Sequence, residues 1–308
     1  MAPNVSINRI AGIDVGGTFI KSGLISGNQI ITTRRDPTPS SPTEIIDTLT
    51  FIIQTLSPQL VGIGMPGLVQ HGVVSHPPNL PGWSVIDLQT ELRKRVNLPV
   101  FVDNDANMVT YGEFRMGAAQ GLRNVILLTL GTGVGAGLII DGQLYHGKGY
   151  AGEIGHITVE PHGYRCHCGN RGCLEAYVGT SYVIPRVKAI LPYRDSLLNK
   201  YPEITMETIA TAANQGDPFA TEIIDEIAYY LGIGIATLYS IFDPDAIILG
   251  GGVANIGAPF FTKVKSYATQ RLYGDRDIVL LPSKLKDTAG VWGAALWALD
   301  QYTHSFGE

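Results

Sequence analysis

The stretch IAGIDVGGTFIKSGLISGNQII, residues 10–31, predicts how the first part of the chain folds. It is typical of an apolar strand, a turn at Gly16 and Gly17, an alternating strand through Ile20 and Leu24, and a third strand after a turn at Gly27. Residues 10–31 therefore predict an antiparallel meander whose first turn is made of glycine.

The same order of elements begins again after Asn124. VILLTL (residues 125–130) is typical of a strand, GTGVGAG (131–137) of a glycine turn, and LIIDGQLY (138–145) of a hairpin. Helices are expected at about residues 175–190, 205–214 and 218–242. Although the residues themselves do not repeat, the repeated order of elements predicts an α/β chain with two lobes.

The glycine turns are candidate phosphate sites. Paired glycines let successive backbone N–H groups point into a concavity, and Asp14 lies at a strand end where a hydrated Mg²⁺ could be held. Lys21 is close enough in sequence to reach the same anion. A plain tight hairpin explains this motif equally well. The strand ending in Gly250, Gly251 and Gly252, ahead of a helix at about residues 257–272, is another such candidate.

An α/β crossover follows the first meander. Apolar spacing over residues 45–56 predicts an amphipathic helix, and LVGIGM (60–65) predicts a buried strand that ends at Pro66 and Gly67. The loop HPPNLPGW (76–83) presents Asn79 and Trp83. An amide and an aromatic ring on a proline-stiffened loop suit sugar recognition, although a structural turn fits equally well.

Asp103, Asn104 and Asp105 stand where the next strand gives way to a helix that runs to about Met116. Ligands bind at such strand ends in α/β sheets. Asp105 could serve only as a helix cap. Two carboxylates with an amide between them at this place favour chemistry over capping.

All three cysteines lie within EIGHITVEPHGYRCHCGNRGCLE, residues 153–175. Three thiols, with His156, His162 and His167 nearby, offer the ligands of a closed Cys3His zinc site, which would shape the loop and leave no position open for water. The spacing alone allows any of the three histidines to be the fourth zinc ligand. An odd cysteine count and no apparent leader argue against the alternative, a disulfide between Cys166 and Cys173.

Bulk composition excludes several classes of protein. The 308 residues are 45% hydrophobic and 16% charged, with a net charge of -5, so no basic patch indicates a nucleic-acid partner. The uncharged run at residues 227–242 is too short for a membrane span and is flanked by acids, which predicts a buried helix. The N-terminus shows no secretion signal. A cytoplasmic protein without membrane partners is expected.

Together these motifs resemble the ROK family (repressors, open reading frames, sugar kinases), and within it the bacterial glucokinases. The motifs that carry the resemblance are IDVGGT (13–18), MPG (65–67), NLPGW (79–83), DNDAN (103–107), LGTGVGAG (130–137), EIGH (153–156), CHCGNRGCLE (166–175) and ILGGG (248–252). The resemblance covers about residues 10–299. It implies an actin-like, ribonuclease-H-like fold with two lobes, and ATP and hexose in the cleft between them.

The resemblance also implies roles for individual residues. Asp105 would be the base that accepts the proton of the hexose 6-hydroxyl. The zinc ligands would be His156, Cys166, Cys168 and Cys173. The sugar would be bound by Gly67, Asn79, Asn104, Glu153, His156 and Glu175, with Asp105 also in contact. ATP with Mg²⁺ would be bound by Asp14, Gly16, Gly17, Thr18, Lys21, Gly131, Thr132, Gly133, Gly250, Gly251 and Gly252.

The expected lobes are residues 1–120, completed by a C-terminal helix at 288–308, and residues 121–287, which include the zinc loop 153–175. Phe19 departs from the Lys or Asn of many relatives, which leaves Lys21 as the expected phosphate contact. The repressor branch carries an N-terminal helix-turn-helix, for which no room is expected before the first strand. A homodimer is implied. Glucose is the expected substrate; N-acetylglucosamine, N-acetylmannosamine, mannose, fructose, or a non-catalytic sugar-responsive regulator are the alternatives.

Overall fold

The computed structural model of the protein describes residues 7–78 and 80–306. The chain forms two compact units. Unit 1 comprises Met1–Gly121, Gly137–Ala151 and Lys284–Glu308, and unit 2 comprises Leu122–Ala136 and Gly152–Ser283. The lobe boundaries expected at residues 120 and 288 stay a prediction; the compact units add residues 137–151 to unit 1.

Unit 1 is built on a five-stranded sheet with the order β3-β2-β1-β4-β8 and a small sheet β5-β6-β7. Its strands are β1 (Ile10–Val15), β2 (Phe19–Ser26), β3 (Gln29–Pro37), β4 (Leu60–Met65), β5 (Leu68–Gln70), β6 (Val73–Ser75), β7 (Ile86–Asp87), β8 (Val100–Asn104) and β11 (Gln143–Leu144). Its helices are α1 (Pro42–Leu56), α2 (Leu88–Val96), α3 (Asp105–Met116), η5 (Lys286–Thr288) and α9 (Ala289–Phe306).

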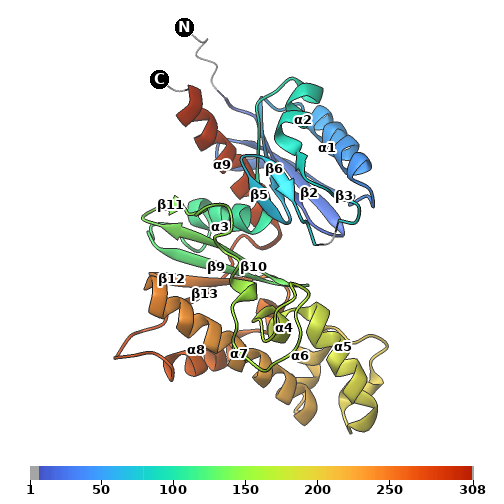
Figure 1. Cartoon of the computed structure of the whole chain (residues 1–308), viewed down its shortest axis with the longest axis vertical. Helices are drawn as coiled ribbons and strands as arrows, with labels where there is room; N and C mark the ends of the chain where they lie inside the picture. The colour runs from blue at the N-terminus through green and yellow to red at the C-terminus, as the bar shows by residue number, and fades with distance from the viewer. Residues whose placement is uncertain (1–6, 79, 307–308) are drawn as a thin grey trace. The chain divides into compact units, whose positions relative to one another are not determined.

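The predicted glycine meander is confirmed. β1 pairs antiparallel with β2, which pairs antiparallel with β3. β4 and β8 then extend the sheet in parallel with β1, because α1 and α2 carry the chain back between the strands. Figure 1 shows α1 and α2 side by side.

The buried side of α1 supplies much of the first core cluster. Ser41 caps the helix by accepting a hydrogen bond from the Glu44 backbone N–H at 3.3 Å, Pro42 occupies the first turn, and Ser57 ends the helix in a left-handed conformation. Ile45, Ile46, Leu49, Ile52, Ile53 and Leu56 are buried, and all of them belong to the cluster formed with β1, β4 and β8. The predicted amphipathic spacing is confirmed here.

Helix α9 packs on unit 1 through glycines. A Cβ atom at Gly12 of β1 would lie 1.9 Å from the Val291 carbonyl oxygen, and one at Gly62 of β4 would lie 1.8 Å from the Ala294 carbonyl oxygen. Val291, Trp292, Ala295 and Ala298 are buried in a second cluster with residues of β1, β2, β4 and β8. The backbone of α9 therefore lies directly against the sheet.

Unit 2 combines strands of a second sheet with several helices. The sheet has the order β11-β10-β9-β12-β13, and β10 (Val134–Ile140) passes from unit 2 into unit 1 at Gly137. The elements of unit 2 are β9 (Val125–Leu130), η1 (Ile154–His156), α4 (Glu175–Val178), α5 (Thr180–Ile190), η2 (Leu191–Tyr193), η3 (Leu197–Lys200), α6 (Met206–Asn214), α7 (Pro218–Phe242), β12 (Ala246–Gly250), η4 (Val253–Ile256), α8 (Ala258–Thr269) and β13 (Leu280–Pro282).

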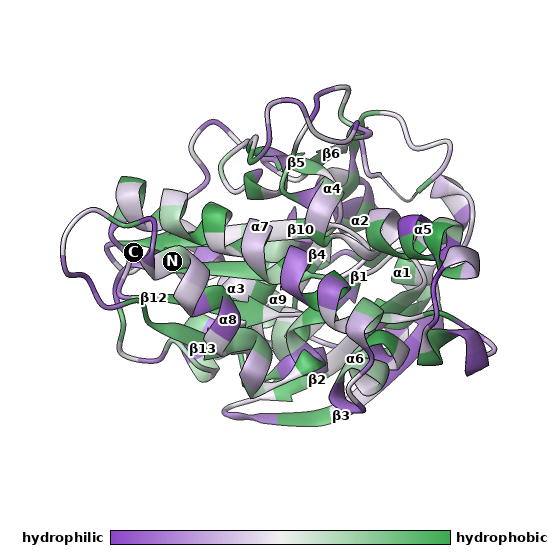
Figure 2. Cartoon of the chain, turned by 90° about the horizontal axis from the view of Figure 1, so that it is seen from below, coloured by the Kyte–Doolittle hydropathy of each residue, from purple (hydrophilic) through white to green (hydrophobic). Residues whose placement is uncertain are grey.

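The long apolar helix α7 has the bounds that the sequence predicts and packs against α8. α8 buries Phe260, Val264 and Ala268 at helical spacing, and Figure 2 shows hydrophobic and hydrophilic residues on it. Among the described residues, no helix combines the length and apolar composition that crossing a membrane requires. The single helix predicted over residues 175–190 is wrong, because the chain is extended at Gly179 between α4 and α5.

We expect Gly62→Ala to destabilise unit 1 by about 3 kcal/mol or more, because the added methyl group would overlap the backbone of α9 and neither backbone can move cheaply. Thermal unfolding of the variant measures the effect. Gly27→Asn is the matched control: Gly27 has open space around it, and Asn tolerates its positive φ of 56°. Equal melting temperatures for both variants would contradict the close packing of α9.

Candidate functional site

The junction of β8 and α3 fixes the two residues that follow Asp103. Asn104 is the N-cap of α3: its Oδ1 accepts a hydrogen bond from the Asn107 backbone N–H at 3.1 Å, and its Nδ2 donates to the Gly67 carbonyl at 3.0 Å. Asp105 is the first residue of α3 and is half-buried. Asn104 and not Asp105 therefore occupies the N-cap position, although Asp105 Oδ1 accepts a hydrogen bond from the Ala106 backbone N–H at 2.8 Å.

The side chain of Asp14 lies near that of Asp105 in unit 1. Burial, reinforced by the charges of Asp105 and Asp287 and opposed by Lys21, raises the pKa of Asp14 to about 7. A Cβ atom at Gly290, in the first turn of α9, would lie 2.7 Å from Asp14 Oδ2, so only glycine lets the carboxylate approach that helix end. A site with this much negative charge favours a cation.

Lys21 projects from β2 and forms an ion pair with Asp287, with 2.7 Å between its Nζ and Asp287 Oδ1. The pair lowers the pKa of Asp287. Because Asp287 is largely exposed, the pair is weak and a stronger anion could take the ammonium group.

The first glycine turn is closed by its own hydrogen bonds. The Gly16 N–H donates to the Phe19 carbonyl at 3.0 Å, and the Gly16 carbonyl accepts from Thr38 Oγ1 at 2.7 Å. The Thr18 carbonyl accepts from the Thr38 N–H. The Gly16 backbone therefore stabilises the turn through both its N–H and its carbonyl group.

The corresponding turn in unit 2 packs against α5. The Gly131 N–H donates to the Gly133 carbonyl at 3.0 Å, and the Gly131 and Thr132 carbonyls accept from Thr180 and Ser181. Gly251 follows β12 with a positive φ of 85°, where a Cβ atom would lie 2.4 Å from the Leu130 carbonyl oxygen. Two of the three predicted phosphate turns therefore meet within unit 2.

Four side chains of unit 2 gather their ligand atoms within 4.8 Å of one another: His156, Cys166, Cys168 and Cys173. All three cysteines are free thiols, so the disulfide alternative is not formed. His167 instead lies against Tyr182, with 4.8 Å between the ring centroids, and the His162 backbone N–H donates to Glu160. The cluster therefore selects His156 among the three histidines that the spacing allowed.

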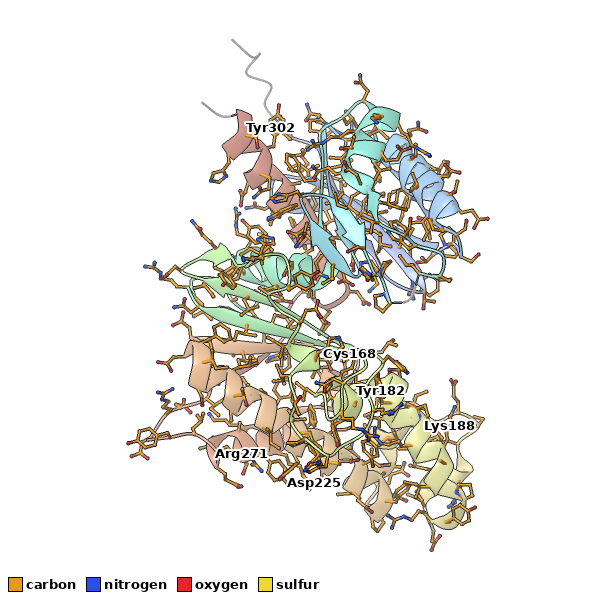
Figure 3. The ribbon with its side chains drawn as sticks, viewed as in Figure 1. Cys168, Tyr182, Lys188, Asp225, Arg271 and Tyr302 are labelled. Carbon is orange, nitrogen blue, oxygen red and sulfur yellow. The ribbon has the colours of Figure 1, made fainter. Side chains whose placement is uncertain are left out.

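The distances in this cluster suit a tetrahedral metal ion. Cys168 Sγ and Cys173 Sγ lie 3.6 Å apart, as do Cys166 Sγ and His156 Nδ1. Bonds of about 2.3 Å to sulfur and 2.0 Å to nitrogen give tetrahedral edges of about 3.8 and 3.5 Å. The Tyr182 hydroxyl donates to Cys166 Sγ at 3.5 Å and so supports the cluster. Figure 3 labels Tyr182 and the cluster residue Cys168. The four residues could hold a metal ion.

The other ring nitrogen of His156 faces away from the sulfur atoms. His156 Nε2 lies 3.8 Å from Glu153 Oε2. Glu175 is tied to the glycine turn, because its Oε2 accepts from the Val134 N–H at 2.9 Å. Burial, helped by Glu175 and opposed by His156, raises the pKa of Glu153. The cluster thus fixes the ring while Nε2 and two carboxylates form a polar group beside it.

The predicted site residues divide between the two units. Unit 1 carries Asp14, Gly16, Gly17, Thr18, Lys21, Gly67, Asn104 and Asp105. Unit 2 carries Gly131, Thr132, Gly133, Glu153, His156, Cys166, Cys168, Cys173, Glu175, Gly250, Gly251 and Gly252. Asn79 lies outside the described residues. Trp83 packs on the first core cluster, and its ring N–H donates to the Val74 carbonyl at 3.3 Å, so at least its N–H has a structural role.

The sequence did not single out the contact between His146 and Asp103. His146 Nε2 lies 2.6 Å from Asp103 Oδ2, although the residues are far apart in the chain. Asp103 could be noticed as the first acid of its motif, but an isolated histidine on a loop gives no signal of its partner. This contact exists only because the loop after β11 returns to the end of β8.

Comparisons with known proteins agree on one family. Residues 10–301 match the ROK family. A glucokinase of Halalkalibacterium halodurans is 36% identical, over 96% of this chain and 96% of the relative. A xylose repressor of Bacillus subtilis is 33% identical, over 94% of this chain and 77% of the repressor.

A solved structure agrees as well. The ROK family glucokinase from Streptomyces griseus, in complex with glucose and AMPPNP, has a TM-score of 0.83 and 36% identity, over 95% of this chain and 99% of the other. These similarities confirm the α/β sugar kinase fold that the motifs predict.

We expect the pH dependence of stability to reveal the raised pKa of Asp14. Since its pKa is about 7 in the folded protein and near 3.8 when unfolded, the stabilisation is complete below pH 4 and is lost as the pH rises through 7. Asp14→Asn should therefore gain stability relative to the wild type between pH 5 and pH 8, by up to about 1.4 kcal/mol per pH unit. Urea unfolding without nucleotide or Mg²⁺ at both pH values measures this gain, and a pH-independent difference would contradict it.

Proposed function

Because the chain belongs to the ROK family, we propose that it is an ATP-dependent hexokinase that transfers the γ-phosphate of ATP to the 6-hydroxyl of glucose. Membership of the sugar kinases is supported by glucokinases that are 36% identical over more than nine-tenths of this chain. The observation that supports the proposal is the placement of Asp105, a half-buried carboxylate at the first position of α3, directly after the Asn104 cap and near Asp14.

In this proposal Asp105 accepts the proton of the attacking hydroxyl. Asn104 and Gly67 are already joined by a hydrogen bond and form one part of the sugar site. The remaining sugar contacts are Asn79, Glu153, His156 and Glu175. Phosphoryl transfer needs mainly alignment and neutralisation of charge, so groups that hold the phosphates should matter as much as the proton transfer.

The phosphate groups would be held by the glycine turns and Lys21. Their residues are Gly16, Gly17, Thr18, Gly131, Thr132, Gly133, Gly250, Gly251 and Gly252. Lys21 would leave its exposed pair with Asp287 for the more highly charged phosphate. Asp14 would hold hydrated Mg²⁺, and a nearby cation would return its carboxyl group to the charged form.

Zn²⁺ is the metal that best fits three thiolates and one imidazole. With four protein ligands it would be structural. Coordination through Nδ1 would leave His156 Nε2 to face a sugar hydroxyl, so the structural metal ion should also affect sugar binding. The same proposal places the protein in the cytoplasm as a homodimer, without nucleic-acid or membrane partners.

Two alternatives remain within reach of the same fold. N-acetylglucosamine or N-acetylmannosamine could replace glucose, because contacts to shared hydroxyls do not distinguish a 2-hydroxyl from a 2-acetamido group. A sugar-responsive regulator without catalysis is the second, favoured by the identity to the xylose repressor of Bacillus subtilis. The position of Asp105 favours catalysis over the non-catalytic regulator.

We expect Asp105→Asn to lower kcat for glucose phosphorylation by about 10²- to 10⁴-fold, because the amide cannot accept the hydroxyl proton. Glucose affinity, measured by calorimetry, should stay within about threefold, since an amide keeps the hydrogen-bonding shape. Unchanged turnover would refute the assigned base. Loss of sugar binding together with turnover would instead show that Asp105 binds the substrate only.

We expect Cys168→Ser to lose bound zinc and to weaken both thermal stability and glucose affinity, because a hydroxyl is a poor zinc ligand. Metal content by mass spectrometry and sugar binding by calorimetry measure both effects. His162→Ala, which alters a loop histidine outside the cluster, is the control and should keep its zinc. Normal metal content in Cys168→Ser would contradict the assigned ligands.

A further inference from the structure

The contact between His146 and Asp103 is adjacent to Asn104 and Asp105, which the proposed mechanism uses. Asp103 is the penultimate residue of β8, an edge strand of the sheet in unit 1. His146 stands two residues after β11, on the loop that leads toward Glu153. The His146 Nε2 and Asp103 Oδ2 atoms are 2.6 Å apart, and the Asp103 side chain is 4% exposed.

Asp103 uses its other oxygen to hold the turn into α3. Oδ1 accepts hydrogen bonds from the Asn104 backbone N–H at 2.6 Å and from Asn107 Nδ2 at 3.1 Å. Asn104 in turn caps α3 and reaches the Gly67 carbonyl. The orientation of one buried carboxylate therefore sets the backbone that presents Asn104 and Asp105.

A buried carboxylate needs a partner that satisfies its charge. The hydrogen bond with Asp103, assisted by the backbone of Leu144 and opposed by burial, raises the pKa of His146. A protonated ring donates from both nitrogens and so suits a carboxylate on one side and a backbone carbonyl on the other. Trp297 of α9 lies against the ring, with 6.4 Å between centroids.

Both residues of this pair line a cavity of about 630 Å³ in unit 1. Its walls come from β5, α2, β8, the 146–149 loop and α9. The other charged or titratable side chains on these walls are His71 and Lys148, and Asp103 is the one acid among the described residues that line it. No second carboxylate there competes for His146.

We propose that His146 is a positioning residue for the transfer reaction: by holding Asp103, it fixes the turn that presents Asn104 and Asp105 to the sugar. This inference rests on the proposed function. Among the described residues, His146 contacts Asp103 and none of those proposed to bind ATP. Its loss should therefore disturb the alignment of Asp105 more than the binding of ATP.

The test compares His146→Ala, which removes the donor, with His146→Gln, which keeps an N–H donor of similar reach. We expect His146→Ala to lower kcat with glucose by about 10-fold or more, with KM for ATP within about twofold. His146→Gln should stay within about threefold of the wild type. His71→Asn is the matched control, because His71 lines the same cavity and Asn tolerates its left-handed backbone.

A wild-type kcat in His146→Ala, or equal losses in both His146 variants, would overturn the inference. If His146→Ala does not fold, His146→Met replaces it, since it keeps volume without a donor. A wild-type protein that phosphorylates no sugar would overturn the proposed function and this inference with it. An active wild type whose activity does not depend on His146 would overturn this inference alone.

An NMR titration tests the contact without any assay of activity. We expect the His146 ring, assigned by the loss of its signal in His146→Gln, to titrate at a higher pH in the wild type than in Asp103→Asn, because the contact with Asp103 raises the pKa of His146. An equal midpoint in both proteins would show that the pair does not form in solution and would overturn the inference.

Discussion

Helix α9 approaches the sheet and α3 of unit 1 so closely that only glycine fits at the points of contact. A Cβ atom at Gly62 would overlap the Ala294 carbonyl, and one at Gly293 would overlap the Met108 carbonyl of α3. Gly290, in the first turn of the same helix, admits the Asp14 carboxylate. The docking of α9 therefore sets the position of α3, which carries Asp105, and the surroundings of Asp14. The chemistry proposed for unit 1 depends on this contact.

In each unit, neighbouring residues hold the side chains of the candidate site in place. In unit 1, Asp103 and His146 brace the turn that presents Asn104. In unit 2, the His156 and cysteine cluster fixes the imidazole ring and leaves Nε2 toward Glu153. In the proposed function, both arrangements would place a polar atom for a sugar and would restrain its motion, which is how positioned groups keep their geometry during catalysis.

Local patterns in the sequence predicted most of the fold. The glycine meander, α1, β4 and α7 follow from periodicity and turn residues, because short-range spacing determines which face is buried. The break at Gly179 was missed, since a helical pattern continues across it. The clustered cysteines identified the possible metal site, whereas the partner of Asp103 could not be predicted. His146 reaches it through tertiary packing, which leaves no regular spacing in the sequence.

The measurement that most directly tests the account is ATP-dependent formation of sugar phosphate with Mg²⁺, across glucose, mannose, fructose, N-acetylglucosamine and N-acetylmannosamine at equal concentration. The account predicts that glucose gives the highest kcat/KM and that the product carries phosphate on the 6-hydroxyl. A preferred acetamido sugar would keep the mechanism but contradict the substrate. Sugar binding without transfer to any of the five would contradict the assignment of a kinase.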